Sequence, residues 1–269
     1  MPASMHRCGA NDRHRAESFE HAGGATTHGQ ARLSLLGSFE LSCGGRDVQL
    51  PMSACRLLAF LALREHPVSR AYAADMLWLE VPCDRAHANL RNTLWRIHRA
   101  GLALVDRRGE QLRLSKDVHV DVHEARAYAN RLLSGEDLGQ VELAATGLTD
   151  ELLPDWYDDW LTIQREGFHQ LRLHALEALA ERLIEAGYPA RALDPGFAAI
   201  AADPLRETPH RLVIRIHLAE GNRREAMRQY DFYRRIVGEQ LGLAPSPRMD
   251  ALVDGLSLHG DGAKTFRRR

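Results

Sequence analysis

The chain has 269 residues, enough for two domains of ordinary size, and its 45% apolar and 26% charged residues are typical of globular proteins. No run approaches the roughly 20 apolar residues of a membrane span, and the N-terminus lacks the apolar core of a signal peptide, so we expect a cytoplasmic protein without membrane contact. The net charge of −1 conceals an asymmetry: residues 32–116 carry 13 Lys and Arg against 8 Asp and Glu, whereas residues 117–269 carry 19 against 25. This asymmetry favours a polyanion partner for the front half.

The first 118 residues predict a small mixed domain after a disordered start. Residues 1–30 show little periodicity, which indicates disorder. Strand-type segments then follow, separated by glycines, and predict an antiparallel meander over 32–36, 39–43 and 47–50. Two helices come next, one capped by Ser53 and ending near Arg64, the other capped by Ser69 and spanning 70–78.

The stretch PCDRAHANLRNTLWRIHR, residues 82–99, predicts a helix with two distinct faces. One face is apolar and can dock on a core: Ala86, Leu90, Leu94 and Ile97. A second stripe, about 120° away, carries only guanidinium and carboxamide groups: Arg85, Asn89, Asn92, Arg96 and Arg99. Such groups pair with guanine and adenine edges or with phosphates. The alternative is an ordinary amphipathic helix with a solvated polar face. Trp95 is expected to pack on the first helix.

A basic hairpin follows this helix over residues 102–115 and closes the unit at about Val118. Its arginines, Arg107, Arg108 and Arg113, are candidates for phosphate or minor-groove contact, with a solvated turn as the alternative. Arg91, on the flank of the helix, is a further phosphate candidate. Strands, three helices and a hairpin in about 85 residues match a winged helix-turn-helix, whose third helix enters the major groove of DNA.

The rest of the chain reads as helix throughout. We expect a helix over 122–133 and a pair of helices, or one broken at Gly147, over 137–152. Further helices are expected over 160–186, 190–202, 203–220 and 223–241, with a short one starting at 246–247 and a flexible tail over 258–269. The string EAGYPARA (185–192) is echoed by EGNRREA (220–226) about 35 residues later, which is the period of tetratricopeptide repeats. Pro195 predicts a kink, or a helix that starts late.

Catalytic, cofactor and metal motifs are missing from the sequence. There is no P-loop and no nucleophile-elbow motif, and the histidines are scattered. The cysteines, Cys8, Cys43, Cys55 and Cys83, form no C-x-x-C pair and no zinc-finger spacing, so we expect reduced thiols. The sequence therefore predicts a protein that is not an enzyme and has neither a cofactor nor a metal site.

The sequence resembles the SARP-type bacterial transcriptional activators (Streptomyces antibiotic regulatory proteins). These proteins join an OmpR-type winged helix-turn-helix to a bacterial transcriptional activator domain of tetratricopeptide-like helices. The strings that carry the resemblance are LGSF (36–39), RLLAFLAL (56–63), LW (77–78), ANLRNTLWRI (88–97), DPLRE (203–207), HLAEGN (217–222), QY (229–230) and LGLAPSP (241–247). Two departures are GEQL (109–112), where the family commonly has Gly-Tyr in the wing, and the proline at 195.

The resemblance implies a mostly α fold with a small β meander and wing, divided into residues 31–118 and 120–257. It implies an activator that binds promoter direct repeats as a homodimer and recruits RNA polymerase, regulating a secondary-metabolite gene cluster. In this family the connection between the second and third helices faces polymerase, so Glu80 and Asp84 are candidates for contact with sigma factor or an alpha subunit; a plain exposed loop is the alternative. The rival function is a protein-interaction adaptor whose winged domain binds protein rather than DNA.

Overall fold

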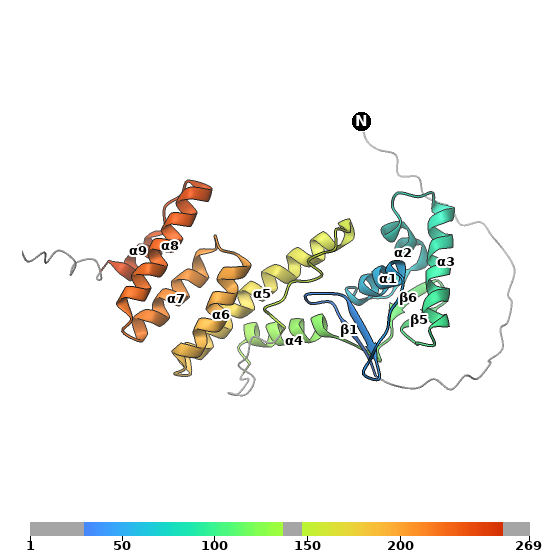
Figure 1. The fold of residues 1–269 in the computed structure, drawn as a ribbon, viewed down its shortest axis with the longest axis horizontal. Helices are drawn as coiled ribbons and strands as arrows, with labels where there is room; N and C mark the ends of the chain where they lie inside the picture. Colours follow the sequence, from blue (N-terminus) through green and yellow to red (C-terminus); the bar gives the residue numbers. More distant parts are fainter. Residues whose placement is uncertain (1–29, 137–146, 255–269) are drawn as a thin grey trace, which may run out of the picture.

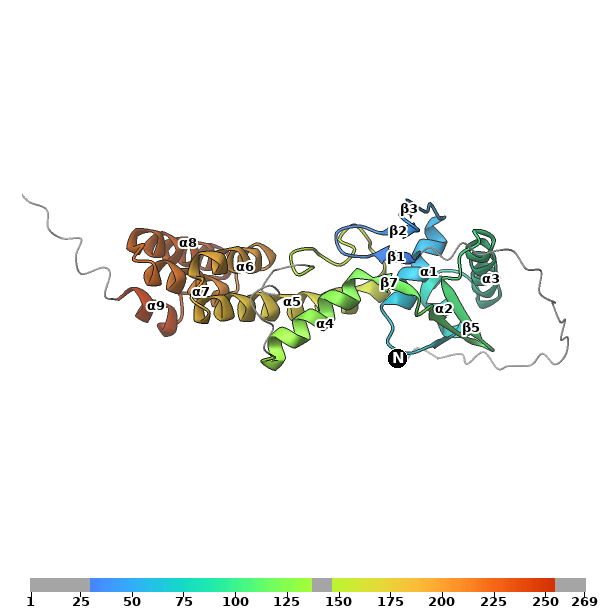
Figure 2. The same ribbon diagram turned by 90° about the horizontal axis from the view of Figure 1, so that it is seen from below.

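A computed structural model describes residues 30–136 and 147–254. Within these ranges the chain forms a mixed α/β unit at one end and a stack of helices at the other, as Figures 1 and 2 show. The expected disordered start and flexible tail, and most of the helix expected over 137–152, lie outside the described residues. Of the helices described, none is long and apolar enough to cross a membrane.

The mixed unit contains two small sheets. The first has the order β3-β2-β1-β7, from the meander β1 (Ala31–Ser34), β2 (Glu40–Cys43) and β3 (Arg46–Asp47) and a returning strand β7 (Val118–Val120) that pairs parallel to β1. The second joins β4 (Val68–Ser69) to the hairpin strands β6 (Gln111–Leu114) and β5 (Val105–Arg108). The sequence predicted the meander and the hairpin but not β7, because three residues carry too little periodicity to reveal a strand.

Three helices share one hydrophobic core with these sheets: α1 (Met52–Ala62), α2 (Arg70–Leu77) and α3 (Cys83–Arg99). The predicted cap of α2 is confirmed, since Ser69 Oγ accepts a hydrogen bond from the Tyr72 amide at 3.1 Å. The predicted cap of α1 is wrong: Ser53 lies inside the helix, which begins after Pro51 without a side-chain cap. Proline suits this place because its missing N–H would have no helical partner in the first turn.

The helical half stacks successive antiparallel helices. It comprises α4 (Asp121–Ser134), α5 (Asp159–Glu185), α6 (Pro189–Ala202), α7 (Glu207–Ala219), α8 (Arg223–Leu241) and α9 (Pro247–Val253). Each of α5 to α8 packs against the next along the chain, the arrangement of a tetratricopeptide-like stack. The fold class predicted from the sequence is thus confirmed.

Two expectations for this half are wrong, and a third is narrowed. Helix α6 begins at Pro189 and contains Pro195, so it does not start late, and the alternative of a kink at Pro195 stays a prediction. The next helix does not begin at 203–204: Asp203 Oδ1 accepts from the Leu205 amide at 3.2 Å, a local turn that delays α7 until Glu207. Residues 147–152 form no helix but a turn and an isolated bridge between Leu152 and Leu36.

Helix α5 takes part in both halves of the molecule. Its first turns contribute Trp160, Leu161 and Phe168 to the core that α1–α3 and the sheets enclose. Its later turns place Leu173, Leu176 and their neighbours in the core of the helical stack. The division of the chain near residue 119 stays a prediction. The 27-residue helix α5 contributes side chains to the cores of both halves.

The carboxylate of Asp121 links the meander to the start of α4. It accepts hydrogen bonds from the Ser34 hydroxyl at 2.6 Å and from the backbone amides of Leu35 and Leu36 at 2.9 and 3.1 Å.

We therefore expect Asp121→Ala to lower the free energy of unfolding by about 2–3 kcal/mol, because hydrogen bonds to a charged group are stronger than those between neutral groups. Urea denaturation followed by circular dichroism measures this loss. The control is Asp117→Ala, an exposed aspartate near by, expected to change stability by about 0.5 kcal/mol or less; equal losses in the two variants would contradict the assignment.

Candidate nucleic-acid interface

Helix α3 is anchored by one apolar face. Four apolar residues of this face are buried: Ala86, Leu90, Leu94 and Ile97. They belong to the core of the mixed unit, which we call the winged unit because the β5–β6 hairpin, its wing, follows the third helix. Each fully buried Leu or Ile contributes about 1.5–3 kcal/mol, enough to hold the helix in one orientation. Its charges also suit the helix dipole, with Asp84 in the first turn and Arg96, His98 and Arg99 in the last.

The polar stripe of α3 faces solvent. Arg85, Asn92, Arg96 and Arg99 are exposed and Asn89 is half-buried, while Arg91 on the flank is exposed as well. In Figures 1 and 2, α3 lies at the outer side of the winged unit, and α6 to α9 lie at the far end of the molecule. The helical stack therefore leaves this face open to a large partner.

Trp95 joins the exposed side of α3, so the expectation that it packs on α1 is wrong. Its side chain is 56% exposed, and the Arg99 guanidinium lies 5.1 Å from its ring centroid. At 100° per residue, Trp95 lies about 80° from Arg85, on the side away from the leucines. The helical spacing by itself places Trp95 beside the polar stripe.

The hairpin arginines have different surroundings. The turn of the hairpin falls at residues 109–110, with Gly109 at φ +58°, and Arg107 and Arg108 precede it on β5. Arg107 Nη2 donates to the carbonyl of Leu94 at 3.1 Å, which ties the wing to α3; partial burial, followed by the nearby positive charge of Arg70, lowers the Arg107 pKa. Arg113 pairs with Asp106 at 3.1 Å, whereas Arg108 is exposed on the outer strand.

The connection between α2 and α3 is a short exposed loop. Glu80 and Leu79 are exposed, and Asp84 is exposed just inside α3. The two acidic candidates are therefore both near the N-terminal end of α3.

Three side chains of metal-binding type come together where α2 meets α3: Asp75, Cys83 and His87, whose ligand atoms all lie within 4.8 Å of one another. Sequence analysis missed this group because Asp75 belongs to α2; the Cys-x-x-x-His spacing of the other two, which share a helix face, was the available signal.

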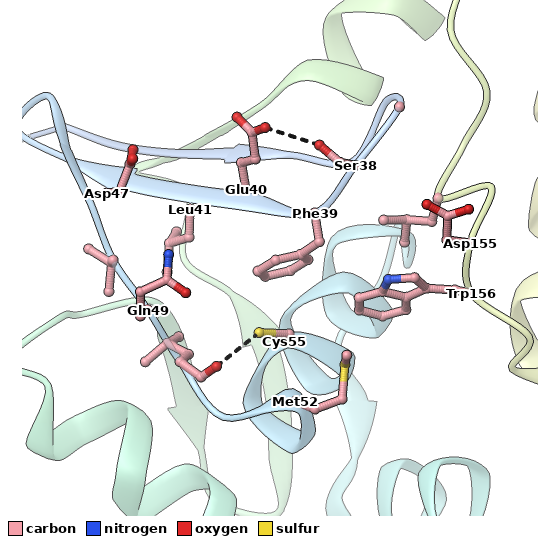
Figure 3. A pocket seen from close by; sticks show the side chains of 14 residues that line it. Ser38, Phe39, Glu40, Leu41, Asp47, Gln49, Met52, Cys55, Asp155 and Trp156 are labelled. Carbon is pink, nitrogen blue, oxygen red and sulfur yellow. Dashed lines mark hydrogen bonds between the residues drawn. The ribbon is translucent and has the colours of Figure 1, made fainter.

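A surface pocket of about 570 Å³ lies away from α3, between the meander, the start of α1 and the segment before α5. Figure 3 shows Phe39 and Trp156 on its wall, with ring centroids 5.7 Å apart, and the carboxylates of Glu40, Asp47 and Asp155 around it. Cys55 donates to the Leu50 carbonyl at 3.6 Å at its floor. None of the sequence candidates for nucleic-acid contact lines this pocket.

The exposure of Trp95 has a direct optical consequence. We expect Trp95→Phe to remove the largest single share of the tryptophan emission that acrylamide can quench, because Trp160 is buried and Trp78 and Trp156 are half-buried. Stern–Volmer plots of the variant and the parent protein measure this. Trp160→Phe is the control and should remove protected emission instead. A Trp95→Phe protein that is quenched as strongly as the parent would show that the side chain is covered.

Comparison with known proteins agrees with this architecture. Residues 117–256 match the family described as "Bacterial transcriptional activator domain". The regulatory protein AfsR of Streptomyces griseus is 29% identical over 210 residues, and that of Streptomyces coelicolor 28% over 207; each match covers 73% of this chain but 21% of the relative, so the chain spans about a fifth of the length of these relatives.

Among solved structures, Mycobacterium tuberculosis EmbR in complex with a low affinity phosphopeptide superposes with a TM-score of 0.65 at 20% identity, over 84% of this chain and 64% of that one. At this identity the likeness concerns the fold alone. The family match covers more than half of the chain, and the family is one of transcriptional regulators rather than enzymes. The chain belongs to the SARP-type family of bacterial transcriptional activators, which carry the bacterial transcriptional activator domain.

Proposed function

We propose that this protein is a sequence-specific DNA-binding activator that inserts α3 into the major groove of promoter DNA in the cytoplasm. The observation that carries the proposal is the exposed stripe of guanidinium and carboxamide groups on α3, a helix whose other face is buried in the core through its leucines. Arg and Asn side chains can pair bidentately with guanine and adenine, each good pair discriminating against the wrong base by about 1–3 kcal/mol. Arg85, Asn89, Asn92, Arg96 and Arg99 would supply these contacts.

The wing and the flank of α3 would supply the phosphate contacts. Arg91 and Arg108 are exposed and suit this role best, whereas Arg107 and Arg113 already bind partners inside the winged unit and rank below them. In this arrangement the Arg107 hydrogen bond to α3 sets the position of the wing relative to the base-reading helix. Phosphate contacts release counterions and make binding fall with salt.

Activation would follow from the acidic loop beside α3. Glu80 and Asp84 are exposed at the end of α3 where they can meet a basic patch on sigma factor or an alpha subunit. The helical stack would mediate homodimer contacts between copies bound side by side on direct repeats. The likeness to regulators from Streptomyces supports a role in a secondary-metabolite gene cluster.

Removal of one base-reading side chain tests the proposal. DNase footprinting on the intergenic DNA beside the gene supplies the duplex, and we expect Arg96→Ala to weaken binding to it about 10- to 100-fold in a gel shift, the loss of one bidentate contact. Arg224→Ala, an exposed arginine on α8, is the matched control and should bind like the parent. An Arg96→Ala protein with native circular dichroism and unchanged affinity would refute the assignment. A parent protein with no salt-dependent affinity for duplex DNA would favour the adaptor function instead.

The wing is tested separately by its salt dependence. We expect Arg108→Ala to weaken binding to all duplexes alike and to reduce the slope of log K against log salt by about 1, because one phosphate contact is lost. Arg113→Ala is the comparison, and its slope should change less, since Asp106 already neutralises that guanidinium. Fluorescence anisotropy over a salt series measures both slopes. Equal slopes for Arg108→Ala and the parent would place the wing off the DNA.

A further inference from the structure

Three side chains of metal-binding type meet where α2 and α3 come together. Asp75 comes from α2, and Cys83 and His87 come from the first turns of α3. Their ligand atoms all lie within 4.8 Å of one another, and Cys83 Sγ is 4.0 Å from His87 Nε2. No other such group occurs in the described residues 30–136 and 147–254.

The three ligand types in this cluster favour zinc. A thiolate, an imidazole and a carboxylate together suit Zn²⁺, which binds sulfur at about 2.3 Å and nitrogen or oxygen at about 2.0–2.2 Å. In a tetrahedral site these lengths put ligand atoms about 3.5 Å apart, so the observed group needs only a small contraction. Asp75 is exposed and the other two are half-buried, which leaves their side chains room to turn.

The local structure also prepares the ligands. Cys83 and His87 are four residues apart on one helix, so they lie on the same face. Cys83 is the first residue of α3, and Asp75 lies on the preceding helix α2. We propose that Asp75, Cys83 and His87 bind one Zn²⁺ ion, with water at the fourth position, and that the ion ties α2 to α3.

This site would brace the activator without touching its polar stripe. Cys83 and His87 lie about 160–200° around the helix from Arg85, on the side opposite the guanidinium and carboxamide groups. The segment between the ligands, residues 76–82, contains Glu80. A metal bridge closes this segment into a short loop and restricts its motion, because it holds both ends together. The inference does not depend on whether α3 binds DNA.

The test uses the whole 269-residue chain, stripped with a chelator, reloaded with Zn²⁺ and desalted. We expect one zinc per chain by elemental analysis, and a sulfur-to-metal charge-transfer band in the near ultraviolet when Co²⁺ replaces it. Cys83→Ser and His87→Gln should lose both signals while keeping native circular dichroism. Cys55→Ser, Cys8→Ser and His98→Gln are matched controls and should keep both. A parent protein without stoichiometric zinc, or a Cys83→Ser protein that keeps the cobalt band, would overturn the proposal.

Hydrogen exchange gives a second measurement, whose main comparison is made on the parent protein. Zinc added to the stripped parent protein should slow amide exchange in residues 76–82 at least severalfold. The same addition should leave exchange in α8 unchanged and should have no effect on residues 76–82 of His87→Gln. Equal exchange in residues 76–82 with and without zinc would overturn the proposed bridge.

Discussion

The structure depends on the docking of the first turns of α5 into the winged unit. Trp160 meets Phe60 of α1 edge-on, with ring centroids 5.2 Å apart, and its indole N–H donates to Asp158 at 3.0 Å. The same carboxylate pairs with Arg56 of α1, whose Nε lies 2.7 Å from it. An aromatic contact and a shared ion pair thus fix one helix of the repeat stack against the first helix of the winged unit.

Two arginines on α5 hold the irregular segment that leads into it. Arg165 donates to the carbonyls of Leu152, Leu153 and Trp156 at 2.5–3.1 Å. Arg172, two turns further on, is 2% exposed and reaches Thr149 and Glu151 at 3.3 Å. Because a separation of seven residues brings both guanidiniums to one side of the helix, they donate to the same irregular segment, mainly to its backbone carbonyls. Leu153, in this segment, has a positive φ of +44°.

The two halves extend in different directions from this junction. The winged unit presents α3, the wing and the α2–α3 loop on its outer side, while the helical stack extends away from them (Figure 1). A large partner can therefore reach α3 without displacing α6–α9. Both α4 and α5 place side chains in the core of the winged unit and in the core of the helical stack. The pocket beside Phe39 and Trp156 lies next to this junction.

Local patterns in the chain predict most of the helices and strands and the apolar faces of the helices. Hydrophobic period and punctuation by glycine and proline placed the meander, the hairpin and α8, and the apolar positions of α3 fall where burial is observed, because local spacing decides which side chains share a face. The sequence could not reveal the parallel pairing of β7 with β1, the hydrogen bond from Arg107 to the Leu94 carbonyl or the ion pair of Arg113 with Asp106. Nor could it bring Asp75 to Cys83 and His87. Each of these contacts joins two different elements of the fold, so it leaves no period in the chain and forms only when the elements pack together.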